Sequence, residues 1–133
     1  MSRGTVLVAE DAVLVRQRYG EMLRALDCTP LEAANGEEAV ELARTGHPDL
    51  ILMDLRMPVM DGWTAKDRLR QDPRTAAIPI LAVTAVTLEA GEAAFMAHGF
   101  DGYARKPIGP YEMIEIVREW LDDRRREADA ATA

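Results

Sequence analysis

Polar residues that could bind a cation and a phosphoryl group stand at the ends of four apolar runs in this sequence. Each run ends at or just before one of them: Glu10-Asp11, Asp54, Thr84 and Lys106. If the runs are parallel strands, these side chains meet at the sheet edge where open α/β sheets bind ligands. Clustered carboxylates raise one another's pKa unless a cation compensates them, and Mg²⁺ prefers oxygen ligands. The pattern therefore indicates a phosphoryl site.

Asp54 is the residue best placed to react at such a site. It directly follows four apolar residues, so we expect its charge to face a site. A carboxylate can attack phosphorus and form an aspartyl phosphate, while a metal ion and Lys106 neutralise the phosphoryl oxygens. The sequence has no Gly-x-x-x-x-Gly-Lys-Ser/Thr loop and no Gly-rich nucleotide fingerprint, so we expect no ATP site. The protein is interpreted as a phosphoryl acceptor.

The elements that must position these residues alternate regularly along the chain. Apolar runs without alternation predict buried parallel strands over residues 5–9, 29–33, 50–53, 79–83 and 100–104. Apolar residues at three- and four-residue spacing predict helices over residues 12–26, 38–43, 63–69, 88–98 and 110–125. This β-α alternation predicts an α/β fold, with a doubly wound, five-stranded parallel sheet flanked by five helices.

Length, charge and cysteine content narrow the class of protein. The chain of 133 residues suits one domain, which we assign to residues 1–125, followed by a frayed or disordered tail over residues 126–133. The net charge of -7 argues against binding to nucleic acid or an anionic membrane. No apolar run approaches the ~20 residues that span a bilayer. With no signal peptide and the single Cys28, we expect a cytoplasmic protein.

Four motifs along the chain resemble the response-regulator receiver family of two-component signalling. They are Val8-Ala9-Glu10-Asp11, Met53-Asp54-Leu55-Arg56-Met57-Pro58-Val59-Met60-Asp61-Gly62, Val83-Thr84-Ala85 and Tyr103-Ala104-Arg105-Lys106-Pro107. Each stands at the end of an expected strand, and the similarity covers roughly residues 4–122. The resemblance implies a flavodoxin-like sheet with the strand order 2-1-3-4-5.

The resemblance also implies a role for each acidic residue. Asp54 would accept the phosphoryl group from a phosphohistidine on a histidine kinase or a histidine phosphotransfer protein. The ligands of Mg²⁺ or Mn²⁺ would be Glu10, Asp11, Asp54 and the backbone carbonyl of Arg56. Glu10 stands where many family members have aspartate, and its extra methylene still allows a metal contact through water.

The remaining implied roles concern how the signal leaves the site. Lys106 would contact a phosphoryl oxygen, Thr84 would swing its hydroxyl onto the phosphoryl group, and Tyr103 would turn inward. A downstream protein would then bind the surface of the fourth helix, fifth strand and fifth helix. The protein would be a monomer or a phosphorylation-dependent dimer. It would not be an enzyme beyond gaining and losing its own phosphoryl group.

Three alternatives share parts of this site. The same residues would fit the receiver module of a hybrid histidine kinase. A phosphohydrolase with an aspartyl nucleophile commonly has a second aspartate two residues later as its general acid. That position is Arg56 here, which cannot exchange a proton near neutral pH. A receiver fold that signals without phosphorylation would lack an acid or the lysine, whereas this sequence has all of them.

Overall fold

The computed structural model describes residues 2–85 and 91–132 and contains one five-stranded sheet. The strands are β1 (Gly4–Ala9), β2 (Cys28–Ala33), β3 (Leu50–Asp54), β4 (Ile80–Thr84) and β5 (Gly102–Arg105). Their order is β2-β1-β3-β4-β5, and every neighbouring pair is parallel. The chain therefore reverses its direction of progress across the sheet between β1 and β3, which confirms the predicted doubly wound fold and strand order.

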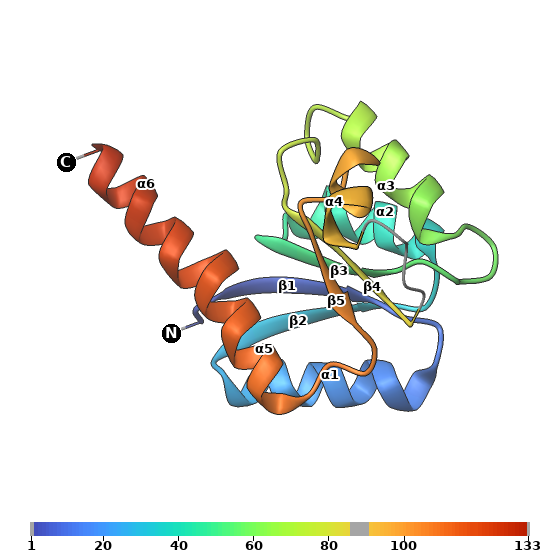
Figure 1. Cartoon of the computed structure of the whole chain (residues 1–133), viewed down its shortest axis with the longest axis horizontal. Coiled ribbons are helices and arrows are strands. Elements are labelled where there is room, and N and C mark those ends of the chain that lie inside the picture. Colours follow the sequence, from blue (N-terminus) through green and yellow to red (C-terminus); the bar gives the residue numbers. More distant parts are fainter. Residues whose placement is uncertain (1, 86–90, 133) are drawn as a thin grey trace.

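Helices cover both faces of this sheet (Figure 1). On one face lie α1 (Val13–Ala25) and α5 (Pro110–Val117), and on the other lie α2 (Gly36–Gly46), α3 (Gly62–Gln71) and α4 (Glu92–Ala97). Within the part of the chain that the structure describes, no helix is long and apolar enough to cross a membrane.

Strand side chains alternate between two apolar layers, one beneath each set of helices. In β3, Leu50 and Leu52 belong to the layer under α1 and α5, whereas Ile51 and Met53 belong to the layer under the other helices. All five β3 residues are at most 5% exposed. This two-sided burial is what an apolar run without alternation predicts, and it places Asp54 at the end of a strand that is enclosed on both faces.

Side-chain caps explain why two helices begin before their predicted starts. The Asn35 side chain accepts a hydrogen bond from the Glu38 N–H at 2.9 Å, and α2 accordingly begins at residue 36. Asp61 caps α3 in the same way, so that α3 begins at residue 62. The first N–H groups of a helix have no partner within the helix, and a capping side chain supplies one. Each helix can therefore begin before the first residue of its apolar pattern.

The fourth helix and fifth strand are shorter than predicted. Residues 86–90, which include the expected start of the helix, lie outside the described residues, and α4 covers Glu92–Ala97. Phe100, which was expected in the strand, lies before it. Its N–H donates to the Phe95 carbonyl at 3.2 Å, and its ring meets the Trp63 ring at a centroid distance of 5.3 Å. These contacts hold Phe100 in the connection, so β5 begins at residue 102.

The C-terminal helix continues past its predicted end. After α5 the chain forms a wider π-helical segment, η1 (Arg118–Asp123), and then α6 (Arg124–Thr132). In Figure 1, α6 projects away from the sheet. A frayed or disordered tail was expected over residues 126–133, whereas the structure is helical to residue 132. Residues 124–131 are exposed, so local helix propensity rather than burial accounts for this helix.

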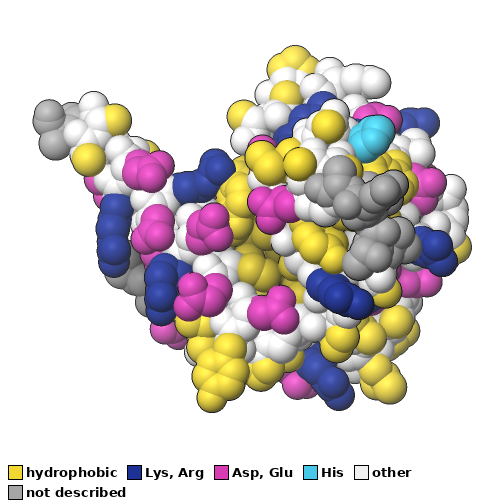
Figure 2. Space-filling model, viewed as in Figure 1, with side chains coloured by type: hydrophobic (Ala, Val, Ile, Leu, Met, Phe, Trp, Pro, Cys, Tyr) yellow, Lys and Arg dark blue, Asp and Glu magenta, His cyan; other side chains and the backbone are white. Residues whose placement is uncertain are grey.

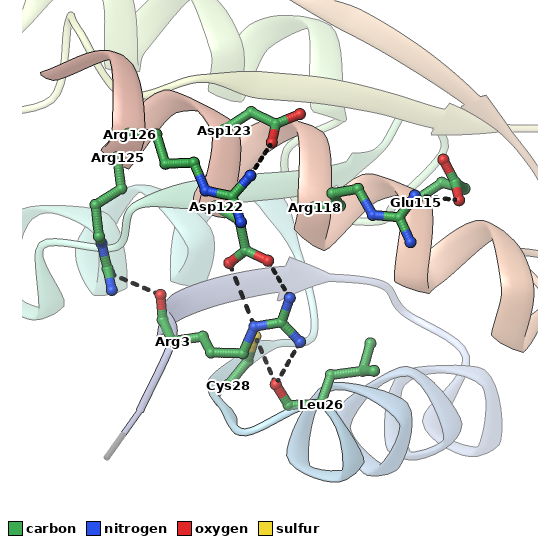
Figure 3. Close-up of polar contacts among 9 residues, drawn as sticks. All are labelled: Arg3, Leu26, Cys28, Glu115, Arg118, Asp122, Asp123, Arg125 and Arg126. Atoms are coloured by element: carbon green, nitrogen blue, oxygen red, sulfur yellow. Dashed lines mark hydrogen bonds and ion pairs between the residues drawn. The ribbon is translucent and has the colours of Figure 1, made fainter. Parts of the chain in front are cut away.

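Polar contacts to the N-terminal segment hold the start of this extension (Figure 3). The Arg3 guanidinium pairs with Asp122 and also donates to the Leu26 carbonyl at 3.3 Å. In return, Arg125 donates to the Arg3 carbonyl at 2.7 Å. Beside these contacts, Leu121 is buried in the layer under α1 and α5. The π-helical segment is thereby fixed to the amino end of β1, far from the polar edge of the sheet.

The start of α3 packs directly against the end of β3. The Gly62 N–H donates to the Leu55 carbonyl at 3.0 Å, and a Cβ on Gly62 would lie only 2.1 Å from the Asp54 carbonyl oxygen. Only a residue without a side chain allows this approach of two backbones. Gly62 therefore sets the position of the loop that follows Asp54.

Replacing Gly62 with alanine should force these two backbones apart. We expect Gly62→Ala to lower the free energy of unfolding by at least about 3 kcal/mol, measured by urea denaturation. Gly109→Ala is the matched control, because a Cβ there would meet no atom within 4 Å. Equal stabilities of the two variants would contradict this description of the loop.

Candidate functional site

Three of the predicted acidic residues meet at the carboxyl edge of the sheet. β1 and β3 are neighbours in register, with Ala9 opposite Met53, so the residues that follow them lie side by side. One carboxylate oxygen from each of Glu10, Asp11 and Asp54 lies within 4.8 Å of the others. Glu10 is 1% exposed and Asp54 is 5% exposed, whereas Asp11 is exposed. The structure thus brings the predicted acids together around Asp54.

Lys106 reaches this cluster from the far side of β4. Its Nζ lies 2.5 Å from Glu10 Oε1 and donates to Asp54 Oδ2 at 3.1 Å. The loop that carries it follows β5, and the Lys106–Pro107 peptide bond is cis. A single ammonium group therefore bridges two buried carboxylates that come from neighbouring strands.

Thr84 and Arg56 lie at the same edge. Thr84 is buried at the end of β4, and its carbonyl accepts a hydrogen bond from the Lys106 N–H at 3.0 Å. The Arg56 N–H donates to Asp54 Oδ1 at 3.4 Å, while its side chain is exposed. A cleft of about 150 Å³ opens here, lined by Asp11, Asp54, Arg56, Thr84, Ala85 and Lys106. The role of the Arg56 carbonyl as a metal ligand stays a prediction.

Tyr103 lies outside this cleft. Its half-buried ring stacks on the Phe95 ring of α4, with a centroid distance of 4.8 Å and an interplanar angle of 4°. Side chains alternate along β5, so Tyr103 faces α4 while its neighbour Ala104 packs under α1 and α5. Of the predicted site residues, Tyr103 is thus the one that the structure holds away from the acids.

Burial and charge shift two pKa values at the site. Burial of Glu10 and its contact with the Asp54 carboxyl raise the pKa of Glu10 to about 7, although Lys106 opposes the shift. For Lys106, burial lowers the pKa, but the hydrogen bond to Glu10 and the charge of Asp54 outweigh it, so that the pKa is raised. The cluster thus keeps Lys106 charged, and one ammonium does not fully compensate the acids.

The donor set fits a hard divalent cation. Glu10 Oε2 is buried, and no hydrogen-bond donor within the described residues faces it. A buried carboxylate oxygen without a partner is costly, and a cation beside it would remove that cost. The other oxygens available at this point come from Asp11 and Asp54. All are hard oxygen ligands of the kind that Mg²⁺ or Mn²⁺ takes from carboxylates.

Sequence reasoning missed two residues that support the site from α1. Arg16 donates to the Glu10 carbonyl at 2.8 Å. The buried Tyr19 hydroxyl accepts a hydrogen bond from the Ile108 N–H at 3.1 Å, two residues after Lys106. Tyr19 has the helical spacing of a core residue, and its partner is 89 positions away. The signal for this contact in the sequence was the hydroxyl of Tyr19, at a position whose helical spacing is that of an apolar core residue.

The raised pKa of Glu10 makes stability depend on pH when no divalent cation is present. The folded protein holds a proton on Glu10 up to about pH 7, whereas the unfolded chain releases it near 4.5. This contribution to stability is therefore present below pH 4.5 and lost as the pH rises through about 7. In EDTA, we expect the unfolding free energy of wild type to fall relative to Glu10→Gln by up to ~3 kcal/mol across this window.

Urea denaturation at a series of pH values measures this difference, and added Mg²⁺ should reduce it. Glu21→Gln, which changes an exposed glutamate on α1, is the control and should run parallel to wild type. A constant difference between wild type and Glu10→Gln from pH 4.5 to 7 would show that Glu10 is already ionised at the lower pH.

Comparisons with known proteins identify relatives of this chain. The model of the response regulator receiver domain matches residues 6–118. The polar-differentiation response regulator DivK of Brucella ovis is 33% identical over 119 residues, which cover 90% of this chain and 97% of DivK. The family match includes the acidic residues, Thr84 and Lys106 within one continuous domain.

Solved structures give the same result. A sensor histidine kinase receiver domain from Pseudomonas aeruginosa, solved with magnesium in its active site cleft, is 31% identical with a TM-score of 0.80. The alignment covers 90% of this chain and 98% of that one. The Ssk1 receiver domain of Saccharomyces cerevisiae, crystallised with the histidine phosphotransfer protein Ypd1, is 28% identical with a TM-score of 0.79, covering 90% of each chain. Since the family match spans most of the sequence and the fold follows solved receivers, this protein belongs to the response regulator receiver domain family.

Proposed function

We propose that Asp54 accepts a phosphoryl group from a phosphohistidine and that this modification is the signal the protein carries. The observation that supports this most directly is the position of Asp54. Its carboxylate is buried at the end of β3, contacts Lys106 at 3.1 Å, and lines a cleft that is open to solvent. It is thus protected on the sheet side and accessible on the other.

The transfer is a substitution at phosphorus. An Asp54 oxygen forms a bond to phosphorus while the phosphorus–nitrogen bond of the donor histidine breaks. The electron pair leaves with the imidazole nitrogen, which takes up a proton. Charge on the equatorial oxygens must be stabilised throughout, and the Lys106 ammonium is already placed beside the Asp54 carboxylate. The Thr84 hydroxyl, at the end of β4, is our candidate for a further contact to the phosphoryl group.

A divalent cation belongs to this proposal because the acids fit one. Glu10, Asp11 and Asp54 would hold Mg²⁺ or Mn²⁺, and the bound metal would supply positive charge to the phosphoryl oxygens. Receiver domains bind Mg²⁺ in such an acidic site, as the Pseudomonas aeruginosa neighbour does. The donor would be a histidine kinase or a phosphotransfer protein, since the Ssk1 receiver is seen with a protein of the latter kind.

The same chemistry suits a free-standing regulator and a module of a hybrid kinase. The relatives include both kinds, in DivK and in the receiver of a sensor histidine kinase. In either setting, Asp54 would receive the group and the rest of the domain would report its arrival.

Phosphorylation by acetyl phosphate tests the assignment of Asp54. With Mg²⁺, wild type should gain the mass of one phosphoryl group in intact-protein mass spectrometry, and EDTA should prevent the gain. Asp54→Asn should gain none, because the amide is not a nucleophile towards phosphorus.

The control for this experiment is Asp61→Asn. Asp61 is an exposed acid seven positions after Asp54, and an asparagine there caps α3 equally well. It should be phosphorylated like wild type. A gain that persists in Asp54→Asn, or the absence of any gain in wild type, would overturn the proposal.

We further propose that the downstream protein binds along β5 and α5 through a basic, amphipathic segment. A groove of about 480 Å³ lies there, with an apolar floor that includes Ala104 and Ile116. Its charged lining consists of Glu112, Glu115 and Glu119 from α5 and η1 and of Arg105 from β5, so that acidic groups predominate. Acidic side chains border an apolar hollow in this region of Figure 2. An apolar floor with an acidic rim complements a partner segment in which cationic side chains flank an apolar side chain.

Tyr103 connects this groove to the switch. Its side chain also lines the groove, and its ring is stacked on Phe95 of α4. If Tyr103 turns inward on phosphorylation, the wall of the groove changes with it. Glu112 and Glu119 have no ion-pair partner within 4 Å among the described residues, so a partner's cations would not have to displace one.

Charge reversal tests the chemistry of this partner. The probe is a synthetic amphipathic helical peptide with leucine on one face and lysines beside it, titrated into ¹⁵N-labelled protein. We expect the double variant Glu112→Lys/Glu119→Lys to bind it about tenfold more weakly than wild type. Glu21→Lys/Glu127→Lys makes the same change of net charge away from the groove and is the control. Equal weakening by both double variants would indicate attraction by net charge alone.

A further inference from the structure

The loop that carries Lys106 is held by two hydrogen bonds from opposite sides. On one side, the Lys106 N–H donates to the Thr84 carbonyl at 3.0 Å, which ties the loop to β4. On the other side, the Ile108 N–H donates to the Tyr19 hydroxyl at 3.1 Å, which ties it to α1. Lys106 lies between these two attachments, so both of them set where its side chain starts.

The contact between Tyr19 and Ile108 is enclosed. Tyr19 is 2% exposed and Ile108 is 1% exposed. Tyr19 also borders a small internal void shared with Glu10 and Asp54, which has no room for a water molecule. If the hydroxyl were removed, the Ile108 N–H would have no solvent to replace it. A buried N–H without an acceptor is unfavourable, and the loop would shift to relieve it.

We propose that Tyr19 is a positioning residue for phosphoryl transfer, whose hydroxyl fixes the loop so that the Lys106 ammonium stays between Glu10 and Asp54. This inference rests on the proposed function of Asp54. It assigns Tyr19 a role that packing alone would not require, because phenylalanine would fill the same space in the layer formed with Leu23 and Met113. The hydroxyl is the part that reaches the loop.

Cation binding and phosphoryl transfer should respond differently to loss of the Tyr19 hydroxyl. The acids that would hold the cation lie at the carboxyl ends of β1 and β3, whose positions do not depend on the loop after β5. Lys106 alone is carried by that loop. A displacement of about 1 Å is enough to weaken a catalytic contact by a large factor. Phosphoryl transfer should therefore slow while cation binding is kept.

The experiment compares Tyr19→Phe with wild type in two assays. Mg²⁺ affinity is measured by isothermal titration calorimetry, and the rate of phosphorylation by acetyl phosphate is measured at saturating Mg²⁺. We expect the affinity to change less than twofold and the rate to fall about tenfold. Tyr111→Phe is the control, because it removes the hydroxyl of a tyrosine that is 85% exposed. It should match wild type in both assays.

A double-mutant cycle separates positioning from a general structural effect. In a Lys106→Ala background, Tyr19→Phe should cause no further loss of rate, because the group that Tyr19 positions is gone. The amide exchange of Ile108 in wild type gives a readout without any substitution, and we expect it to be slow. Fast exchange there would overturn the inference, even if Tyr19→Phe did not fold.

Other outcomes are equally decisive. A parallel loss of Mg²⁺ affinity and rate, or the same tenfold loss in the Lys106→Ala background, would make Tyr19 merely structural. If wild type is phosphorylated and Tyr19→Phe is phosphorylated at the same rate, the positioning role of Tyr19 is overturned. The proposed function of Asp54 is not affected by that result. A wild type that takes no phosphoryl group would instead overturn the proposed function of Asp54, and the positioning role with it.

Discussion

Repulsion among the acids at the carboxyl edge of the sheet is the constraint around which this domain is organised. Two buried carboxylates, Glu10 and Asp54, lie within 4.8 Å of each other and of Asp11. Such a cluster is tolerated only if positive charge is present. Lys106 supplies part of it, yet burial and the contact with the Asp54 carboxyl still raise the pKa of Glu10 to about 7. A divalent cation held by these acids would supply the positive charge that is still needed.

The surrounding fold keeps these charges in place. The strand order puts β1 and β3 side by side, so that acids 44 positions apart share one edge. Gly62 lets α3 approach the end of β3, and the contacts of Thr84 and Tyr19 hold the loop of Lys106. Each support acts on backbone rather than on a charged side chain. The charged groups are thus positioned by neutral contacts that do not change with ionisation.

The sequence by itself determined the fold class and which polar residues lie at the carboxyl edge of the sheet. The β-α alternation and the uninterrupted apolar runs predicted a parallel sheet, because only strands covered on both faces can be apolar at every position. The acids, Thr84 and Lys106 were identifiable since each follows such a run. Element boundaries were less well predicted. Caps at Asn35 and Asp61 extended helices, and ring contacts kept Phe100 out of β5. The spacing of apolar residues does not predict such polar and aromatic contacts.

Only the tertiary structure decided how the site residues meet. The sequence placed Lys106 at the edge, but the bridge from its Nζ to both Glu10 and Asp54 depends on a loop beyond the neighbouring strand. The support from Tyr19 could not be predicted from spacing, because its partner Ile108 is 89 positions away. The stacking of Tyr103 on Phe95 depends on how α4 packs against β5, which spacing does not specify. Residue type and periodicity specify which groups reach an edge. Distances between them follow from packing, because side-chain contacts form only once the layers are assembled.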